Sequence, residues 1–385
     1  MEVMACIYIR IVYLVHTNAS METFCSQPTG NICLPDAVFP SKATGRMVVA
    51  KMTSTPLPRM GLGMAALGRP GYITLDRATI FGADDRTVEK MQNQANLVLE
   101  ELFKECRNAD QTPWLDCARS YGLSEQFVGE FLRHRKQDPK SVYVSSKWGY
   151  TYVADFKVEL DPGAKHEIKD HSTENFLKQV KETKEHLGEY IDLYQIHSAT
   201  FDSGILTDYR AHEALASCRK QLGWAIGLSV SGPEQGHVIR EASKIQVRST
   251  DDSYGPLFGS VQCTYNVLEQ SPGEALLEAH EAGMDIIIKE GLANGRALLN
   301  PTILEYSKRL GCEPDQLALA CILAQPFCPR VLSGAVTPQQ LSSNLKAQEV
   351  AKKLIESNSL LKEIMTATYV DSDLYWSDRA ALAWN

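Results

Sequence analysis

The sequence predicts an eight-stranded parallel α/β barrel of the (βα)8, or TIM, type on three observations. Runs of β-branched and aromatic residues alternate with segments whose apolar residues recur every three or four positions, which is the pattern of strands followed by helices. Eight such strand–helix units can be counted if residues 330–334 form the last strand. Parallel strands with helical crossovers need both faces covered, and eight of them favour closure into a barrel.

The chain of 385 residues divides into three parts by composition. We expect residues 1–55 to form an extension outside the fold, residues 56–370 to form the barrel, and residues 371–385 to form an aromatic tail. In the extension, the apolar run at residues 7–15 is broken by Arg10 and is too short to span a membrane. The extension is typical of a plastid or mitochondrial transit peptide. The alternatives are a disordered extension of a cytoplasmic protein, or an upstream start codon with the folded protein beginning near Met52.

The first predicted strand lies in residues 60–68, MGLGMAALG. Gly61 and Gly63 partly imitate a glycine-rich dinucleotide loop, but the spacing does not fit and no acidic residue ends a following strand, which argues against a Rossmann fold. We expect these glycines to let a substrate or cofactor approach the backbone.

The remaining elements follow in order. The later strands are expected within residues 114–122, 141–149, 190–197, 225–230, 260–265, 285–289 and 330–334. Helices are expected at residues 84–106, 124–132, 173–186, 211–221, 234–242 and 272–282. A longer excursion occupies residues 149–169, at the end of the barrel where loops determine specificity.

Composition excludes several classes of function. The net charge is −8 and the acidic and basic residues are interspersed, so no basic stripe suggests a nucleic-acid partner. Ten cysteines without CxxC pairs indicate a reducing compartment. Nine histidines form no HExxH or paired ligand spacing, and we predict no metal site.

Four titratable residues lie at or just past the ends of three successive predicted strands. Asp116 and Tyr121 belong to WLDCARSYG, Lys147 to SVYVSSKWG, and His197 to YIDLYQIH. In a parallel barrel these strand ends share one face, so the four side chains are expected to converge. Separately they have ordinary explanations, such as a structural ion pair between Asp116 and Lys147 or a loop histidine at position 197.

Together the four residues predict proton transfer to a carbonyl oxygen. Asp116 would hold the Lys147 ammonium charged, and the ammonium would lower the pKa of Tyr121 towards working pH. Tyr121 would then protonate the oxygen as hydride reaches the carbon, while His197 orients and polarises it.

With these residues, the sequence resembles the aldo-keto reductase superfamily. The matching positions are Asp116, Ala118, Tyr121 and Gly122 in a DxAxxYG-like motif, then Lys147 and His197, and the resemblance runs from about residue 60 to about residue 350. The resemblance implies a (βα)8 barrel that reduces an aldehyde or ketone to an alcohol.

The resemblance also implies a nicotinamide cofactor, with NADP(H) favoured over NAD(H). It assigns Ser229 and Gln262 to the carboxamide of the nicotinamide. It assigns the start of the last helix to a phosphate, with Gly334, Thr337, Gln340 and Asn344 as the matching residues. For Thr337, ordinary helix capping explains the residue equally well.

The chain departs from the family pattern at three places that bear on the cofactor. Val230 follows Ser229 where the family often has an Asn that contacts the carboxamide. Lys289 and Glu290 stand where many members have an aromatic residue, and Lys289 would meet the pyrophosphate or pair with Glu290. No Arg or Lys lies between positions 334 and 344, although a 2′-phosphate favours a fixed guanidinium partner.

Met64, Trp148 and Tyr150 are the candidate substrate-binding residues. The tail contains Tyr375, Trp376, Arg379 and Trp384, and we expect it to fold over the mouth of the barrel or to pack elsewhere. The substrate is expected to be a small carbonyl compound, such as a sugar or another aldehyde. The sequence leaves the oligomeric state open.

Two other classes of function remain open at this point. A non-catalytic barrel that binds a nicotinamide dinucleotide would act as a regulatory or redox-sensing subunit. A lyase or isomerase would instead use Lys147 as a Schiff-base nucleophile, and it would work without a dinucleotide.

Overall fold

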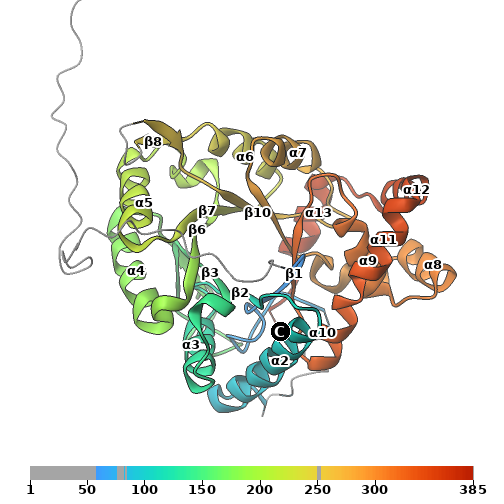
Figure 1. Ribbon diagram of the computed structural model, residues 1–385, viewed down its shortest axis with the longest axis horizontal. Helices are drawn as coiled ribbons and strands as arrows, with labels where there is room; N and C mark the ends of the chain where they lie inside the picture. Colours follow the sequence, from blue (N-terminus) through green and yellow to red (C-terminus); the bar gives the residue numbers. More distant parts are fainter. Residues whose placement is uncertain (1–57, 76–81, 83–84, 249–252, 385) are drawn as a thin grey trace, which may run out of the picture. The chain divides into compact units, whose positions relative to one another are not determined.

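Eight parallel strands close into a barrel, as predicted. The computed structural model describes residues 58–75, 82, 85–248 and 253–384, so the extension at residues 1–55 lies outside the described residues. Around the barrel the strands run in the order β1, β12, β11, β10, β7, β6, β3 and β2, and β2 pairs with β1 (Figure 1). Their bounds are β1 Met60–Gly63, β2 Trp114–Asp116, β3 Tyr143–Trp148, β6 Ile191–Ala199, β7 Ala225–Val230, β10 Ser260–Thr264, β11 Asp285–Lys289 and β12 Arg330–Ser333.

Helices connect these strands and cover the outside of the barrel (Figure 1). Those up to β11 are α2 Val88–Asn108, α3 Ser124–His134, α4 Thr173–Leu187, α5 Tyr209–Leu222, α6 Gln235–Ser243 and α7 Gly273–Glu281. They match the predicted helices within a few residues. The largest shift is in α2, which begins after Thr87 because the Thr87 side chain accepts a hydrogen bond from the backbone N–H of Lys90 (3.3 Å) and caps the helix.

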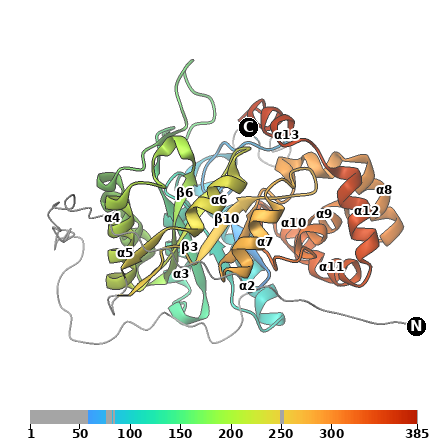
Figure 2. The same cartoon turned by 90° about the horizontal axis from the view of Figure 1, so that it is seen from above.

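The C-terminal third contains helices that the sequence analysis did not assign. A short 3₁₀ segment, Ala293–Leu299, and the helices α8 Pro301–Leu310 and α9 Pro314–Leu323 separate β11 from β12. After β12 follows α10 Pro338–Leu345, the helix whose start was expected from the resemblance. The unassigned helices α11 Ala347–Glu356, α12 Asn358–Thr368 and α13 Ser372–Ala380 come after it. Figure 2 shows α8, α9, α11 and α12 as a group on one side of the barrel strands.

Two antiparallel hairpins extend from the barrel. The excursion after β3 contains β4 Tyr150–Tyr152 paired with β5 Glu167–Lys169. A second hairpin pairs β8 Gln246–Arg248 with β9 Tyr254–Pro256. The first hairpin places its residues beside the carboxyl end of β3, where the candidate site lies. No helix in the described part of the chain is both long and apolar enough to cross a membrane.

The interior of the barrel contains a small apolar cluster of its own. Trp114, Leu193, Ile287 and Leu332 are buried together there. A Cβ atom on Gly61 would lie 2.3 Å from the Trp114 indole, so this glycine makes room for a core side chain and not for a ligand. The expected access to the backbone fits Gly63, which lines the cavity described below.

Candidate active site

A cavity of about 750 Å³ opens at the carboxyl ends of the barrel strands. Residues at or after the ends of five strands line it: Gly63, Asp116, His197, Lys289 and Ser333. Three of the four residues predicted to converge line this cavity, namely Asp116, Tyr121 and His197. The fourth, Lys147, is fully buried, is not among the described lining residues, and donates a hydrogen bond to Asp116.

Asp116 and Lys147 form the predicted ion pair. Lys147 Nζ lies 2.5 Å from Asp116 Oδ2 and donates a second hydrogen bond to the backbone oxygen of Cys117 (2.9 Å). The other carboxylate oxygen, Oδ1, accepts from Ser145 Oγ (2.7 Å), Gln262 Nε2 (3.2 Å) and Gln195 Nε2 (3.3 Å). A buried ion pair needs such additional partners, because its two charges have lost their water.

Tyr121 stands beside the ammonium, but its pKa moves in the opposite direction from the prediction. The Tyr121 ring centroid lies 4.7 Å from Lys147 Nζ. Burial raises the pKa of Tyr121 well above its usual value and the negative charge of Asp116 raises it further, while Arg69 opposes the shift. The predicted lowering was wrong because burial disfavours the charged phenolate and the negative charge of Asp116 adds to the shift. The phenol therefore keeps its proton at neutral pH.

His197 completes the group in a neutral form. Its ring lies edge-on to the Tyr121 ring, with centroids 5.4 Å apart, and its Nδ1 is 3.2 Å from Ser120 Oγ. Burial lowers the pKa of His197 well below its usual value, and the nearby charges of Lys147, Lys289 and Arg69 lower it further. When Nδ1 accepts the Ser120 hydroxyl hydrogen, Nε2 carries the ring hydrogen and can donate to a substrate oxygen.

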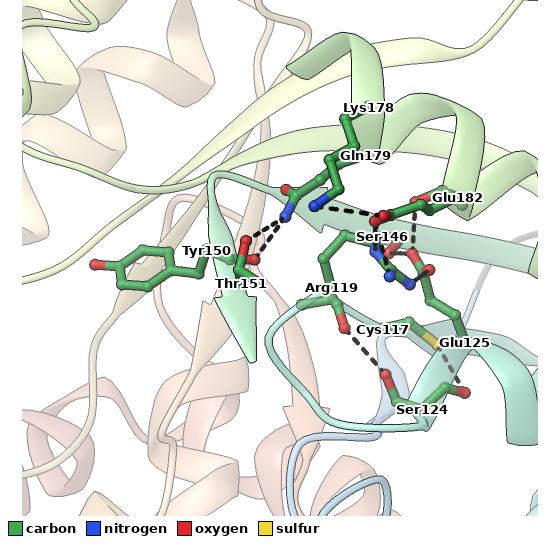
Figure 3. Close-up of polar contacts among 12 residues, drawn as sticks. Cys117, Arg119, Ser124, Glu125, Ser146, Tyr150, Thr151, Lys178, Gln179 and Glu182 are labelled. Atoms are coloured by element: carbon green, nitrogen blue, oxygen red, sulfur yellow. Dashed lines mark hydrogen bonds and ion pairs between the residues drawn. The ribbon is translucent and has the colours of Figure 1, made fainter. Parts of the chain in front are cut away.

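A second buried network holds the loop that carries Tyr121 (Figure 3). Glu125 accepts from Arg119 Nη1 (2.6 Å), Ser146 Oγ (2.5 Å) and Thr183 Oγ1 (2.8 Å). Arg119 also pairs with Glu182 through Nη2 (2.9 Å). The sequence analysis missed this network, although Arg119 lies inside WLDCARSYG. The sequence contained one sign of this network, namely Ser146. Its side chain must face away from the barrel interior if the side chain of Lys147 faces into it.

The candidate substrate residues are not all in the cavity. Tyr150 lines it, with its ring centroid 5.0 Å from that of His197. Trp148 and Met64 are fully buried and are not among the described residues that line the cavity. Trp148 follows Lys147 on β3, so its side chain faces outward. There its ring packs against Phe176 of α4, with the ring centroids 4.9 Å apart.

The C-terminal tail reaches the cavity at the mouth of the barrel, which is one of the two positions expected from the sequence. Arg379 of α13 donates to Glu290 through Nε (2.8 Å), and Asn266 Nδ2 donates to Tyr375 Oη (3.0 Å). Burial raises the pKa of Glu290, but Arg379 and Lys289 outweigh it and hold that pKa at about 2. These contacts fix α13 to the loops after β10 and β11, and both Arg379 and Trp384 line the cavity.

Arg69 is a cavity residue that the sequence analysis did not identify. It lies in the segment after β1, where its guanidinium carbon is 4.8 Å from the Trp384 ring and 5.3 Å from the Tyr121 ring. Its Nη1 pairs with Glu167 of β5 at 2.9 Å. Arg69 thus connects the N-terminal part of the barrel, the hairpin and the tail at one edge of the site.

The residues assigned to the nicotinamide differ in their access to the cavity. Gln262 lines the cavity, and its buried Oε1 has no hydrogen-bond partner among the described residues. Ser229 is buried and accepts from the backbone N–H of Ser198 (2.9 Å), and it is not among the described lining residues. Lys289 lines the cavity and donates to Thr264 Oγ1 (2.6 Å). An unpaired buried acceptor such as Gln262 Oε1 fits the amide hydrogens of a carboxamide.

The residues assigned to a phosphate lie around the start of α10. Gly334, Gln340 and Asn344 line the cavity. Thr337 caps α10 by accepting from the backbone N–H of Gln340 (3.2 Å), and it is not among the described lining residues. Its helix-capping explanation therefore has direct geometric support.

Comparison with known proteins gives a consistent result. The family model described as "Aldo/keto reductase family" matches residues 60–365. An uncharacterized oxidoreductase of Bacillus subtilis (strain 168), YqkF, is 26% identical over 320 residues, which cover 75% of this chain and 92% of that protein.

Two solved structures show the same fold. The aldo-keto reductase AKR11C1 from Bacillus halodurans, in its holo form, aligns with a TM-score of 0.53 and 21% identity over 80% of this chain and 94% of its own. A putative aldo-keto reductase from Pseudomonas aeruginosa aligns with a TM-score of 0.52 and 21% identity over 76% of this chain and 91% of its own. At this identity the likeness concerns the fold.

Proposed function

The chain belongs to the aldo/keto reductase family, whose members carry out oxidoreduction with nicotinamide cofactors, and from this premise we propose that it reversibly reduces a small aldehyde or ketone to an alcohol. Tyr121 is the general acid of the proposed reaction. The observation that carries the proposal is the convergence of a protonated Tyr121, a neutral His197 and the Asp116–Lys147 pair at the mouth of the barrel.

The proposed reaction places the carbonyl oxygen between the phenol of Tyr121 and Nε2 of His197. When bound, the reduced dinucleotide supplies a hydride. As the new C–H bond forms at the carbonyl carbon, the π electron pair moves to the oxygen, which takes the proton of Tyr121. His197 stabilises the negative charge that develops on the oxygen by donating a hydrogen bond to it. The positive charge of Lys147 lies beside the phenol ring of Tyr121.

Gln262 is the residue that best supports a nicotinamide at this end of the cavity. Its Nε2 donates to Asp116, whereas its Oε1 is a buried acceptor without a partner among the described residues. The resemblance alone favoured NADP(H) over NAD(H), and the residues at the other end of the cavity bear on that choice.

The proposal is tested by following oxidation of NADPH and of NADH with a panel of aldehydes in wild type and Tyr121→Phe. We expect Tyr121→Phe to lower kcat about a hundredfold to ten-thousandfold, because that is the usual contribution of general acid catalysis. The matched control is Tyr209→Phe, which makes the same change at an exposed tyrosine of α5 outside the cavity lining and should retain the rate.

Other outcomes would decide against the proposal. A wild-type protein that binds a dinucleotide but reduces none of the aldehydes would favour a regulatory subunit. Activity without a dinucleotide, with borohydride trapping at Lys147, would favour Schiff-base chemistry. The buried ion pair with Asp116 weighs against that second outcome, because a charged ammonium is not a nucleophile.

A further inference from the structure

The cavity has a second end beyond the carboxyl end of β12, which β1 separates from the strand β2 that precedes Tyr121. It is formed where α9 begins and where α10 follows β12. The lining residues there are Glu313, Pro314, Asp315, Gln339, Gln340, Ser343 and Asn344. Between the two ends, Lys289 at the end of β11 and Gly334 after β12 continue the wall.

A dinucleotide with its nicotinamide at Gln262 would extend from β10 past β11 and β12 towards this second end. Its adenosine ribose would therefore meet the residues of α9 and α10. From their chemistry we propose that the cavity selects a dinucleotide with a free 2′-hydroxyl on the adenosine ribose, which is NADH, and discriminates against NADPH. This inference rests on the proposed nicotinamide-dependent function.

The charges of the cavity are distributed unevenly between its two ends. Near Tyr121, Arg69 pairs with Glu167, Arg379 pairs with Glu290, and Lys289 donates to Thr264. At the second end, the described lining residues include two carboxylates, Glu313 and Asp315, and no Lys or Arg. A 2′-phosphate carries close to two negative charges and is usually bound by a fixed guanidinium or ammonium group.

Asp315 is held in place by a buried amide. Asn344 Nδ2 donates to Asp315 Oδ2 (2.7 Å), and Asn344 Oδ1 accepts from Ser333 Oγ at the end of β12 (2.7 Å). Asn344 itself is only 4% exposed, so the contact is anchored in the core. The carboxylate thus cannot move away from a phosphate without breaking this chain of hydrogen bonds.

The same carboxylate suits a ribose hydroxyl. Asn344 occupies Oδ2, and no described residue hydrogen-bonds to Oδ1, so that oxygen can accept from a 2′-hydroxyl. Dinucleotide sites in other folds use an Asp or Glu in this way for NAD and an Arg for NADP. Neighbouring Ser343 is fixed by Gln316 Nε2 (3.1 Å), which adds a second polar contact to this wall.

Direct binding to the full chain tests the inference without relying on turnover. Titration with NADH and with NADPH, followed by tryptophan fluorescence, should give a Kd for NADH at least about tenfold lower, because like charges at close range are unfavourable. The fragments 5′-ADP and 2′,5′-ADP should show the same order by calorimetry. Asp315→Asn keeps the oxygen that accepts from Asn344 but removes the charge, and should narrow the ratio of the two Kd values.

A second variant and a control keep the test decisive. Gln339→Arg adds a guanidinium at the same wall and should lower the Kd for NADPH with little effect on NADH. Glu356→Gln, an exposed residue of α11, makes the same charge change as Asp315→Asn and should leave both Kd values unchanged. An NADPH Kd equal to or below that of NADH in the wild type would overturn the inference while the proposed function stands. Binding of neither dinucleotide would overturn both.

Discussion

The two faces of strand β3 carry two buried ion networks with different uses. On the inner face, Ser145 and Lys147 both bond to Asp116. On the outer face, Ser146 bonds to Glu125, which pairs with Arg119. Successive side chains of a strand point to opposite sides, so three consecutive residues serve both networks.

The networks differ in what they border. Asp116 of the inner network lines the cavity, whereas Glu125 of α3 is 2% exposed and accepts from Ser146 of β3 and Thr183 of α4. Both nevertheless hold the same loop, because Lys147 donates to the oxygen of Cys117 and Arg119 is part of that loop. The comparison shows that one buried charge near the site can take part in the reaction itself. Another can act only by fixing the position of a residue that takes part in the reaction.

The largest effect that would test this distinction is expected from Lys147→Met. It leaves the Asp116 carboxylate buried without its ammonium, which should lower the free energy of unfolding by about 3–5 kcal/mol and abolish most of the turnover. Chemical denaturation and the NADH oxidation assay measure the two effects. The double variant Asp116→Asn, Lys147→Met should recover much of the stability but remain inactive. Recovery of activity in the double variant would contradict a role for the inner charges in the reaction.

A smaller effect is expected from Glu125→Gln on the outer face. Arg119 keeps Glu182, and glutamine can still accept one hydrogen bond, so the loss should be about 1.5–3 kcal/mol of unfolding free energy. Turnover at low temperature should fall much less than in Lys147→Met, because Tyr121 and its neighbours remain. Glu182→Gln is the control, since this side chain is 29% exposed and its ion pair should contribute less than about 1 kcal/mol. A loss of turnover in Glu125→Gln without a loss of stability would place the outer network in the reaction.

The smallest effect is expected from pH. Burial and Asp116 raise the pKa of Tyr121 well above its usual value, so the acid form persists as pH rises. The rate of carbonyl reduction at saturating substrate should therefore stay nearly constant from about pH 6 to about pH 9. A fall in that rate across this range would show that Lys147 lowers the pKa of Tyr121 after all. The condition is that a binding measurement that does not depend on protonation shows no such fall.

Much of the fold and the core of the site could be predicted from the sequence, because both depend on order along the chain. Asp116, Lys147 and His197 each belong to a strand that is recognisable by itself, and parallel strands put their carboxyl ends on one side. The helices α8 and α9 after β11, and α11 to α13 at the C-terminus, were not predicted, because apolar periodicity does not tell which barrel unit a helix completes.

Only the tertiary structure decided the remaining features, because they join residues that are far apart in the chain or depend on burial. Arg379 meets Glu290 from 89 residues away, and Asn344 meets Asp315 from 29 residues away. The direction of the Tyr121 pKa shift depends on how completely the phenol is buried and on the negative charge of Asp116. The sequence by itself determined that Asp116, Tyr121 and His197 stand at or after the carboxyl ends of strands, whereas folding determined their neighbours and the burial that shifts the pKa values of Tyr121 and His197.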